Sequence, residues 1–336
     1  MFPQLFNSRT VVISVSCAAL AAAAGIPQTR GAVQLAVSPQ CGTLAAGVPV
    51  DVNVGLAPLS SYKTIVAFGG KSISGYRARL HRAESTLADS YTGGGATNGP
   101  TWVELLARSA NAQLINYAAT GSVVDTTLWP HAPAIQAASG QDYVNQGVST
   151  RSRVRTAPQI RPARTLESTK TLDPASTLYV MFYGIEDYAE AVATGLTDMS
   201  NIAGSWLYTT LGLEGSGSTL MRNILFVDNY GLGKTSALGD TFKQYVFTAL
   251  GTGHRLNGWN AGFVSLDRVW AGVLYGAPGY KAFGYTDVAG NCVQGNATCA
   301  DPAHTFMWSA GNPTAATHAI MAEYVEKALT QCVSKT

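Results

Sequence analysis

Thr64-Ile65-Val66-Ala67-Phe68 is a short run of apolar and β-branched residues that ends at Gly69-Gly70. Later runs of the same character are rich in Val, Ile, Phe or Tyr and close with Gly, Asn or Asp: Leu114–Tyr117, Leu178–Tyr183, Ile224–Asp228 and Phe263–Leu266. Helical patterns separate or follow these runs, at Trp102–Ser109, Tyr188–Leu211, Ala237–Leu250 and Ala315–Leu329. This alternation predicts an α/β fold in which helices cover both faces of a parallel sheet.

The N-terminal residues have the pattern of a secretion signal. A polar start with Arg9 precedes the apolar, alanine-rich run Val11–Ala24. The small residues Ala22–Ala24 at its end form a cleavage site for a signal peptidase. The run is shorter than the about 20 residues that a membrane-spanning helix needs. We therefore expect a cleaved signal peptide over residues 1–24, an N-terminal extension over 25–62 and a main domain over 63–332. The mature protein is expected to be secreted and soluble.

Four cysteines lie outside the signal, at Cys41, Cys292, Cys299 and Cys332. An even number in an exported chain predicts disulfides. Cys292 and Cys299 are close enough to close a small loop, which leaves Cys41 to meet Cys332, although three connectivities are formally possible. The spacing lacks the two close pairs of a zinc site, so no metal is expected. Asn296-Ala297-Thr298 is a glycosylation acceptor, which predicts that its loop is exposed.

The charge balance excludes some classes of partner. Charged residues make up 12% of the 336 residues and the net charge is +2, which does not indicate nucleic-acid or membrane binding. Residues 148–172 depart from this balance with six basic residues and almost no large apolar ones: Arg151, Arg153, Arg155, Arg161, Arg164 and Lys170. We expect a mobile, solvated loop there, and a basic arm that docks an acidic polymer is the alternative. A monomer without a cofactor is expected.

The carboxyl ends of the predicted strands mark the expected ligand site. In an open parallel sheet, ligands bind beyond these ends, where loops and helix N-termini meet. The corresponding stretches, together with the segment before the last helix, suggest the ligand-contacting residues Gly70, Gly121, Asp187, Tyr230 and Trp308.

Several of these stretches resemble sequence blocks of one family. Ile65–Gly69 looks like the strand before a nucleophile block, and Gly121 matches the glycine of a second block. Gly184-Ile185-Glu186-Asp187 looks like a third block, normally Gly-x-Asn-Asp, and Asn312-Pro313-Thr314 stands where a last block has His-Pro-Thr or His-Pro-Ser. The family is that of the SGNH (GDSL-type) hydrolases.

Two further stretches, Thr97–Glu104 and Asp301–Trp308, are similar to fungal extracellular acetylesterases of the carbohydrate esterase family sixteen type. The resemblance covers roughly Val33 to Cys332, with the blocks in the same order. It implies the SGNH hydrolase fold, a three-layer α/β/α sandwich with a flavodoxin-like parallel sheet.

In that family a serine attacks the ester and a histidine activates it, while backbone N–H groups and an asparagine stabilise the oxyanion. Carried over to this chain, the serine position holds Lys71 in an ungapped alignment, or Ser72 if one residue is inserted. Gly75 favours the ungapped alignment, because the fungal relatives have a glycine at the same distance after the serine. Glu186 replaces the asparagine and Asn312 replaces the histidine. The catalytic candidates Lys71, Ser72, Glu186 and Asn312 therefore form an altered set.

Three functions follow from this alteration. The first is a non-hydrolytic pocket that binds a carbohydrate or a small acyl compound. The second is a repurposed enzyme that uses Lys71 with Glu186 and Asn312 on a small metabolite, against which stands a plain Lys71–Glu186 salt bridge in an inactive cleft. The third is a residual acetylesterase acting through Ser72, which would need one of the histidines, all expected to be structural or on the surface: His81, His131, His254, His304 and His318.

Overall fold

The computed structural model describes residues 32–70, 97–118, 121–129, 172–215, 221–295 and 297–334. The chain divides into Met1–Ala32 and Val33–Thr336, and the fold is that of the second unit. Several expectations lie outside the described residues: those on the signal peptide, on the basic segment 148–172 apart from Leu172, and on Lys71, Ser72 and Asn296.

A six-stranded sheet with the order β1-β6-β5-β4-β2-β3 forms the centre of this unit. Its strands are β1 (Val52–Val54), β2 (Thr64–Gly69), β3 (Gln113–Asn116), β4 (Thr177–Phe182), β5 (Asn223–Asp228) and β6 (Asn260–Ser265). Strands β2 to β6 run parallel, and β1 pairs antiparallel with β6 at the edge. Counted along the chain, the parallel strands have the doubly wound order 2-1-3-4-5, with the switch point between β2 and β4.

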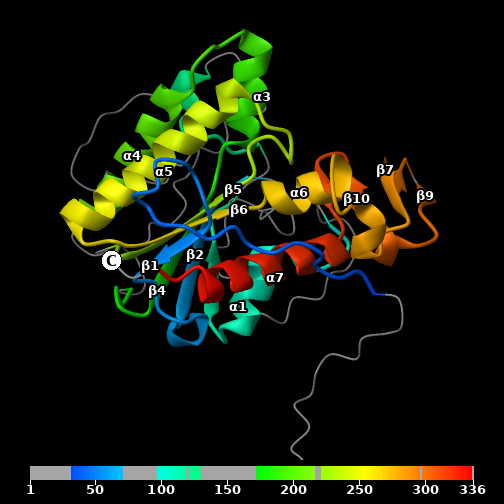
Figure 1. Cartoon of the computed structure of the whole chain (residues 1–336), viewed down its shortest axis with the longest axis horizontal. Coiled ribbons are helices and arrows are strands. Elements are labelled where there is room, and N and C mark those ends of the chain that lie inside the picture. The colour runs from blue at the N-terminus through cyan, green and yellow to red at the C-terminus, as the bar shows by residue number, and fades with distance from the viewer. Residues whose placement is uncertain are drawn as a thin grey trace, which may run out of the picture. The chain divides into compact units, whose positions relative to one another are not determined.

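Helices cover both faces of this sheet (Figure 1). They are α1 (Trp102–Ser109), α3 (Ile185–Thr194), α4 (Ser200–Gly215), α5 (Ala237–Asn257), α6 (Asp267–Leu274) and α7 (Ala315–Gln331). Along β2, Ile65 and Ala67 pack with α1, α6 and α7, whereas Val66 and Phe68 pack with α3, α4 and α5. This alternation builds a core on each face, and the expected α/β architecture with a mostly parallel sheet is confirmed. No helix in the described part of the chain is long and apolar enough to cross a membrane.

The single helix expected over Tyr188–Leu211 is wrong, because the chain forms α3 and α4 there. Gly195 ends α3 in the left-handed conformation, at φ 70°, and its N–H donates to the Ala191 carbonyl. Asp198 then accepts hydrogen bonds from the backbone N–H and the hydroxyl of Ser200, the first residue of α4. A glycine cap and a new start therefore interrupt an apolar pattern that looks continuous in the sequence.

Some elements were not expected from the sequence. Strand β1 comes from the segment expected to be an N-terminal extension, and α6 follows β6 directly. A smaller sheet contains β7 (Asp287–Asn291), β10 (Thr305–Ser309) and β11 (Asn312–Pro313), and β8 (Val293–Gln294) pairs with β9 (Ala297–Thr298). Short 3₁₀ turns complete the described elements: Leu59–Ser61, Thr126–Leu128, Tyr280–Phe283 and Pro302–His304.

Two disulfides join Cys41 to Cys332 and Cys292 to Cys299, which is the pairing that the positions favoured. The first holds the N-terminal segment against the end of α7. Beside it, the Asn53 N–H donates to the Cys332 carbonyl at 2.8 Å, and the Ser334 N–H donates to the Asn53 carbonyl at 2.8 Å. The edge strand β1 is therefore enclosed between β6 and the C-terminal residues.

Candidate functional site

Three of the sequence blocks meet at the switch point of the sheet. Gly70 follows β2, and its N–H donates to the Phe182 carbonyl at the end of β4, at 3.2 Å. A Cβ atom at Gly70 would lie 3.7 Å from the Ser122 carbonyl oxygen and 4.0 Å from Glu186 Cγ. The residues Gly70, Ser122 (beside Gly121) and Glu186 therefore surround one point at the carboxyl edge of the sheet, and we call them the crevice residues.

Glu186 owes its position to the start of α3. Gly184 is the N-cap of this helix at φ 107°, and a Cβ atom there would lie 2.8 Å from the Phe242 ring and 3.4 Å from Tyr230 Cβ. Only glycine allows this turn so close to α5, and the turn places Glu186 in the first helical turn. The N-terminal end of a helix stabilises a negative charge, so the carboxylate of Glu186 itself is well accommodated at this position.

Asp187 anchors the neighbouring segment instead of facing solvent. Its side chain is fully buried. Asp187 Oδ1 accepts from the Val124 N–H and from Trp129 Nε1, both at 3.1 Å. Burial raises the pKa of Asp187 to about 7, against the opposing effect of hydrogen bonds from Trp129, from Val124 and from the N–H groups of Asp187 and Gly184. Asp187 thereby holds the segment Gly121–Trp129 to the start of α3, and its direct contact with a ligand stays a prediction.

The remaining predicted residues lie in different surroundings. Tyr230 is buried, and its hydroxyl donates to Asp240 Oδ1 at 2.7 Å and accepts from the Ser236 N–H at 2.9 Å. Trp308 is half-buried on β10, and Asn312 lies on β11, so both belong to the smaller sheet. Asn312 Nδ2 donates to Ser309 Oγ at 2.9 Å within its own turn.

The three described histidines all have structural partners, as expected from the sequence. His318 is fully buried in α7, and its Nδ1 accepts from the N–H of Trp102 at 3.3 Å, at the start of α1. Burial lowers the pKa of His318 to about 3, so the ring is neutral. His254 Nδ1 lies 2.7 Å from the Trp259 carbonyl, and His304 Nδ1 lies 2.8 Å from Asp301 Oδ2.

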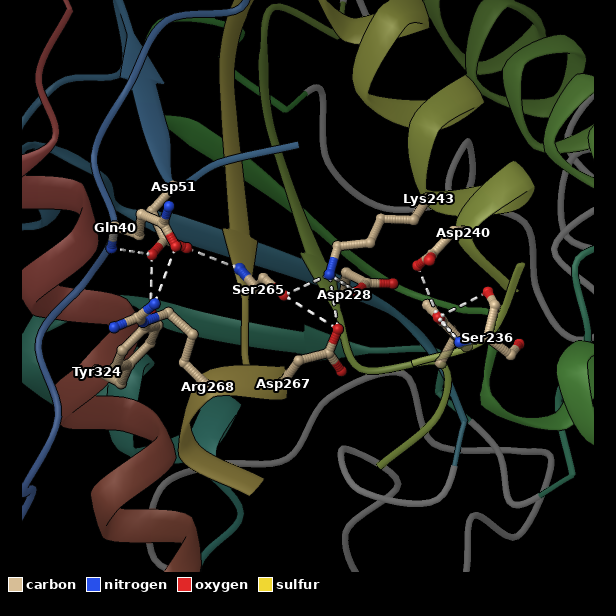
Figure 2. Close-up of polar contacts among 11 residues, drawn as sticks. Gln40, Asp51, Asp228, Ser236, Asp240, Lys243, Ser265, Asp267, Arg268 and Tyr324 are labelled. Atoms are coloured by element: carbon tan, nitrogen blue, oxygen red, sulfur yellow. Dashed lines mark hydrogen bonds and ion pairs between the residues drawn. The ribbon is translucent and has the colours of Figure 1, made fainter. Parts of the chain in front are cut away.

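The sequence did not predict a buried charged cluster at the ends of β5 and β6, formed by Asp228, Lys243, Ser265 and Asp267 (Figure 2). Lys243 reaches it from α5, and its Nζ lies 2.6 Å from Asp267 Oδ2, 2.9 Å from Ser265 Oγ and 3.2 Å from Asp228 Oδ2. Asp228 was visible in the sequence as a strand-end carboxylate. Lys243 gives no such signal, because a lysine on an amphipathic helix is usually solvated.

Through Ser265 the same network reaches the segment around Gln40 and Asp51, and helix α7. The Ser265 N–H donates to Asp51 Oδ1 at 2.8 Å, while the Gln40 N–H and the Tyr324 hydroxyl both donate to Asp51 Oδ2 at 2.7 Å (Figure 2). Asp51 therefore joins the N-terminal segment, β6 and α7. Its signal in the sequence is the alternation of Val50, Val52 and Val54 with Asp51 and Asn53, which is typical of a strand.

Within the described ranges, no group of three or more His, Cys, Asp or Glu side chains is arranged to hold a metal ion. In comparisons with known proteins, no protein-family model and no curated protein matches this chain.

Proposed function

We propose that this chain is a secreted protein of the SGNH hydrolase fold whose crevice binds a carbohydrate or a small acyl compound without hydrolysing it by the serine–histidine mechanism. The observation that carries the proposal is the position of Glu186, beside Gly70 and Ser122 at the switch point between β2 and β4. Ligands of doubly wound sheets bind at this place. The two disulfides support an oxidising compartment.

The charge of Glu186 argues against ester hydrolysis at this point. Hydrolysis places a negative charge on the carbonyl oxygen, which needs N–H donors aimed at it, and losing one such donor raises the barrier by about 2.7–4 kcal/mol. A carboxylate in place of the donor adds repulsion, about 4 kcal/mol for two unit charges 4 Å apart at an effective dielectric constant of 20. The crevice therefore disfavours the transition state that the resemblance implies.

The described histidines also argue against a serine–histidine pair. His318 accepts a hydrogen bond from the Trp102 N–H at the start of α1, and His254 and His304 contact a nearby carbonyl and a nearby carboxylate. Asn312 stands at the position of the family's histidine, and an amide does not accept a proton near neutral pH. A base for the serine mechanism is therefore missing from the described part of the crevice.

The same groups suit a neutral ligand with hydroxyl groups. Glu186 accepts hydrogen bonds from hydroxyls, whereas an anionic ligand would be repelled. The Ser122 hydroxyl is buried and has no hydrogen-bond partner among the described residues, so it has capacity for a ligand or a water. These features favour a neutral carbohydrate over an acyl compound that carries a carboxylate.

Binding and turnover of purified protein test the proposal together. We expect calorimetry to detect binding of neutral oligosaccharides, and Glu186→Gln to weaken it by about tenfold, which corresponds to 1.4 kcal/mol for charge-assisted hydrogen bonds. Glu190→Gln, one turn further along α3, is the matched control and should bind as the native protein does. Acetyl esters should not be turned over above the uncatalysed rate.

The outcomes separate the three functions. Turnover of acetyl esters that Ser72→Ala abolishes would replace this proposal with a residual acetylesterase. Turnover of a carbonyl compound that Lys71→Ala abolishes would replace it with a lysine-based enzyme. The triple variant Lys71→Ser, Glu186→Asn and Asn312→His should gain ester hydrolysis if the crevice has kept the geometry of the family.

A further inference from the structure

The buried charged cluster of Asp228, Lys243, Ser265 and Asp267 contains more negative than positive charge. Its side chains are removed from water, with 0% of the Asp228 side chain, 9% of that of Asp267 and 13% of that of Lys243 exposed. Two carboxylates and one ammonium leave a net charge of −1 if all three are ionised. An uncompensated buried charge is strongly destabilising, so a further positive charge is expected here.

The geometry distinguishes the two carboxyl groups. The three N–H donors of Lys243 face Asp267 Oδ2 at 2.6 Å, Ser265 Oγ at 2.9 Å and Asp228 Oδ2 at 3.2 Å. Ser265 Oγ donates to Asp267 Oδ2 as well, at 3.3 Å. Asp267 therefore has the contacts of an ionised carboxylate, with short donors on one oxygen.

Asp228 has weaker contacts than Asp267. Its distance to Lys243 is the longest of the three, and apart from this ion pair its oxygens receive no well-aligned hydrogen bond within the described residues. Burial with few donors disfavours the charged form of an acid more than the neutral form, because the carboxylate loses more hydration.

We propose that the folded protein keeps a proton on Asp228 at neutral pH. This proton, which we call the latch, makes the stability of the junction of β5, β6 and α5 depend on pH. With the proton bound, the cluster is neutral as one carboxyl, one carboxylate and one ammonium. On release, the carboxyl O–H bond breaks, the proton passes to solvent and a carboxylate remains. No other bond forms or breaks in this step.

The groups around Asp228 favour retention of the proton. From α5 comes Lys243, α6 contributes Asp267, and β6 contributes the hydroxyl of Ser265. Asp240, one turn before Lys243 on α5, is exposed and accepts from the Tyr230 hydroxyl instead. Tyr183 follows β4 on the same face, and Tyr230 follows β5. Asp51 adds a further carboxyl on the far side of Ser265, whereas Arg268 is turned to Gln40, which its Nη1 contacts at 2.9 Å. Within the cluster, two carboxyl groups therefore face one cation.

The pKa directions agree with this geometry. Burial, together with the neighbouring Asp267, raises the pKa of Asp228 to about 7, against the opposing effect of Lys243. Burial alone would lower the pKa of Lys243, but Asp228 and Asp267 outweigh it and raise that pKa above its ordinary value. The lysine therefore stays charged throughout the range in which Asp228 titrates.

The pH dependence of unfolding tests the latch. The pKa of Asp228 rises from 3.8 to about 7 on folding, so its stabilisation is complete below pH 3.8 and is lost as the pH rises through 7. Between these two pH values the folded state keeps one proton that the unfolded state has lost. The folding equilibrium constant therefore falls by about tenfold for each unit by which the pH rises. Asp228→Asn imitates the neutral carboxyl, so the variant should gain stability relative to the native protein by about tenfold per pH unit between pH 5 and pH 7.

Asp240→Asn is the matched control, because it removes an exposed carboxyl of the same helix and should leave the slope of the native protein unchanged. If Asp228→Asn and the native protein differ by a constant amount from pH 5 to pH 8, the proposal is wrong. If Asp228→Asn fails to fold, a measurement on the native protein still tests the proposal. Its infrared spectrum at pH 6 should contain protonated-carboxyl intensity that titrates near pH 7. Because the pKa of Asp187 is also raised to about 7, the part of this intensity that Asp187→Asn leaves belongs to Asp228, and a variant spectrum without it overturns the latch.

Discussion

His318 has a structural role in the fold, in agreement with the expectation from the sequence. Its ring lies between α7 and α1, where Nδ1 accepts from the backbone N–H of Trp102. The first N–H groups of a helix have no partner within the helix, so this contact caps α1 from another element. The burial that makes the contact strong also keeps the imidazole neutral, with a pKa of about 3.

His318→Leu should destabilise the protein by about 1–3 kcal/mol, because the buried N–H of Trp102 loses its acceptor. His318→Asn offers an oxygen close to the position of Nδ1 and should recover part of the loss. Urea unfolding at pH 7 measures both variants. Equal losses in the two variants would show that packing and not the hydrogen bond holds α1.

His318 and Asp228 act on the pH profile with opposite signs. The pKa of His318 falls on folding from 6.5 to about 3, so the stability linked to its neutral form is lost as the pH falls through this range. The stability linked to Asp228 is lost as the pH rises through 7. Only variants of the single residues separate these effects, because the native profile contains their sum together with that of Asp187, whose pKa is also raised to about 7.

Helix α3 is the element on which the crevice depends. It starts at Gly184, ends at Gly195 and carries Glu186 and Asp187 in its first turn. Both glycines have positive φ, at 107° and 70°. Their surroundings differ: a Cβ atom at Gly184 would meet Phe242 at 2.8 Å, whereas one at Gly195 would meet nothing within 4 Å.

Gly195→Ala should lower the free energy of unfolding by about 1–2 kcal/mol, the conformational cost of a left-handed residue. Gly184→Ala should lose about 1–3 kcal/mol more, because the methyl group also displaces Phe242. Only Gly184→Ala should weaken ligand binding, since it moves the start of the helix that carries Glu186. Similar losses of stability in both variants would contradict the contact with α5.

The elements that the sequence predicted well are those with a strong pattern. Parallel strands buried on both faces are continuous apolar runs, and β2, β4 and β5 are found within one residue of the expected runs, whereas β6 begins three residues before its run. The break between α3 and α4 was not predicted, because an apolar pattern continues through Gly195. The smaller sheet was not predicted either, since strands as short as β11 (Asn312–Pro313) have no detectable alternation of apolar and polar residues.

The candidate site could be predicted only where its residues follow strands. Gly70, Gly121 and Glu186 were expected at one edge, and the structure brings Gly70, Ser122 and Glu186 together. Lys243 and Asp267 lie 24 residues apart on two different helices, so their ion pair depends on how α5 and α6 pack. Such a pairing follows from the tertiary fold and leaves no local signal in the chain.

At the scale of the whole molecule, the two disulfides should differ in their effect on stability. The Cys41–Cys332 bridge closes a loop of 291 residues, and the Cys292–Cys299 bridge closes a loop of 7 residues. Loop-closure entropy gives upper values of about 5–6 kcal/mol for the first and about 2 kcal/mol for the second. The double variant Cys41→Ser with Cys332→Ser should therefore lose more stability in non-reducing urea unfolding than Cys292→Ser with Cys299→Ser. The reverse order would show that the chain ends are held by the Asp51 network without help from the bridge.

The position of Cys41 also constrains how the protein is made. Its partner emerges 291 residues later, which at about 5–20 residues per second means roughly a quarter of a minute to one minute of synthesis. During this time the thiol of Cys41 is open to wrong partners, and strand β1 has no partner strand until β6 (Asn260–Ser265) has been made. The six-stranded sheet can therefore form before the Cys41–Cys332 bridge closes, so productive folding depends on whatever shields the Cys41 thiol in the meantime.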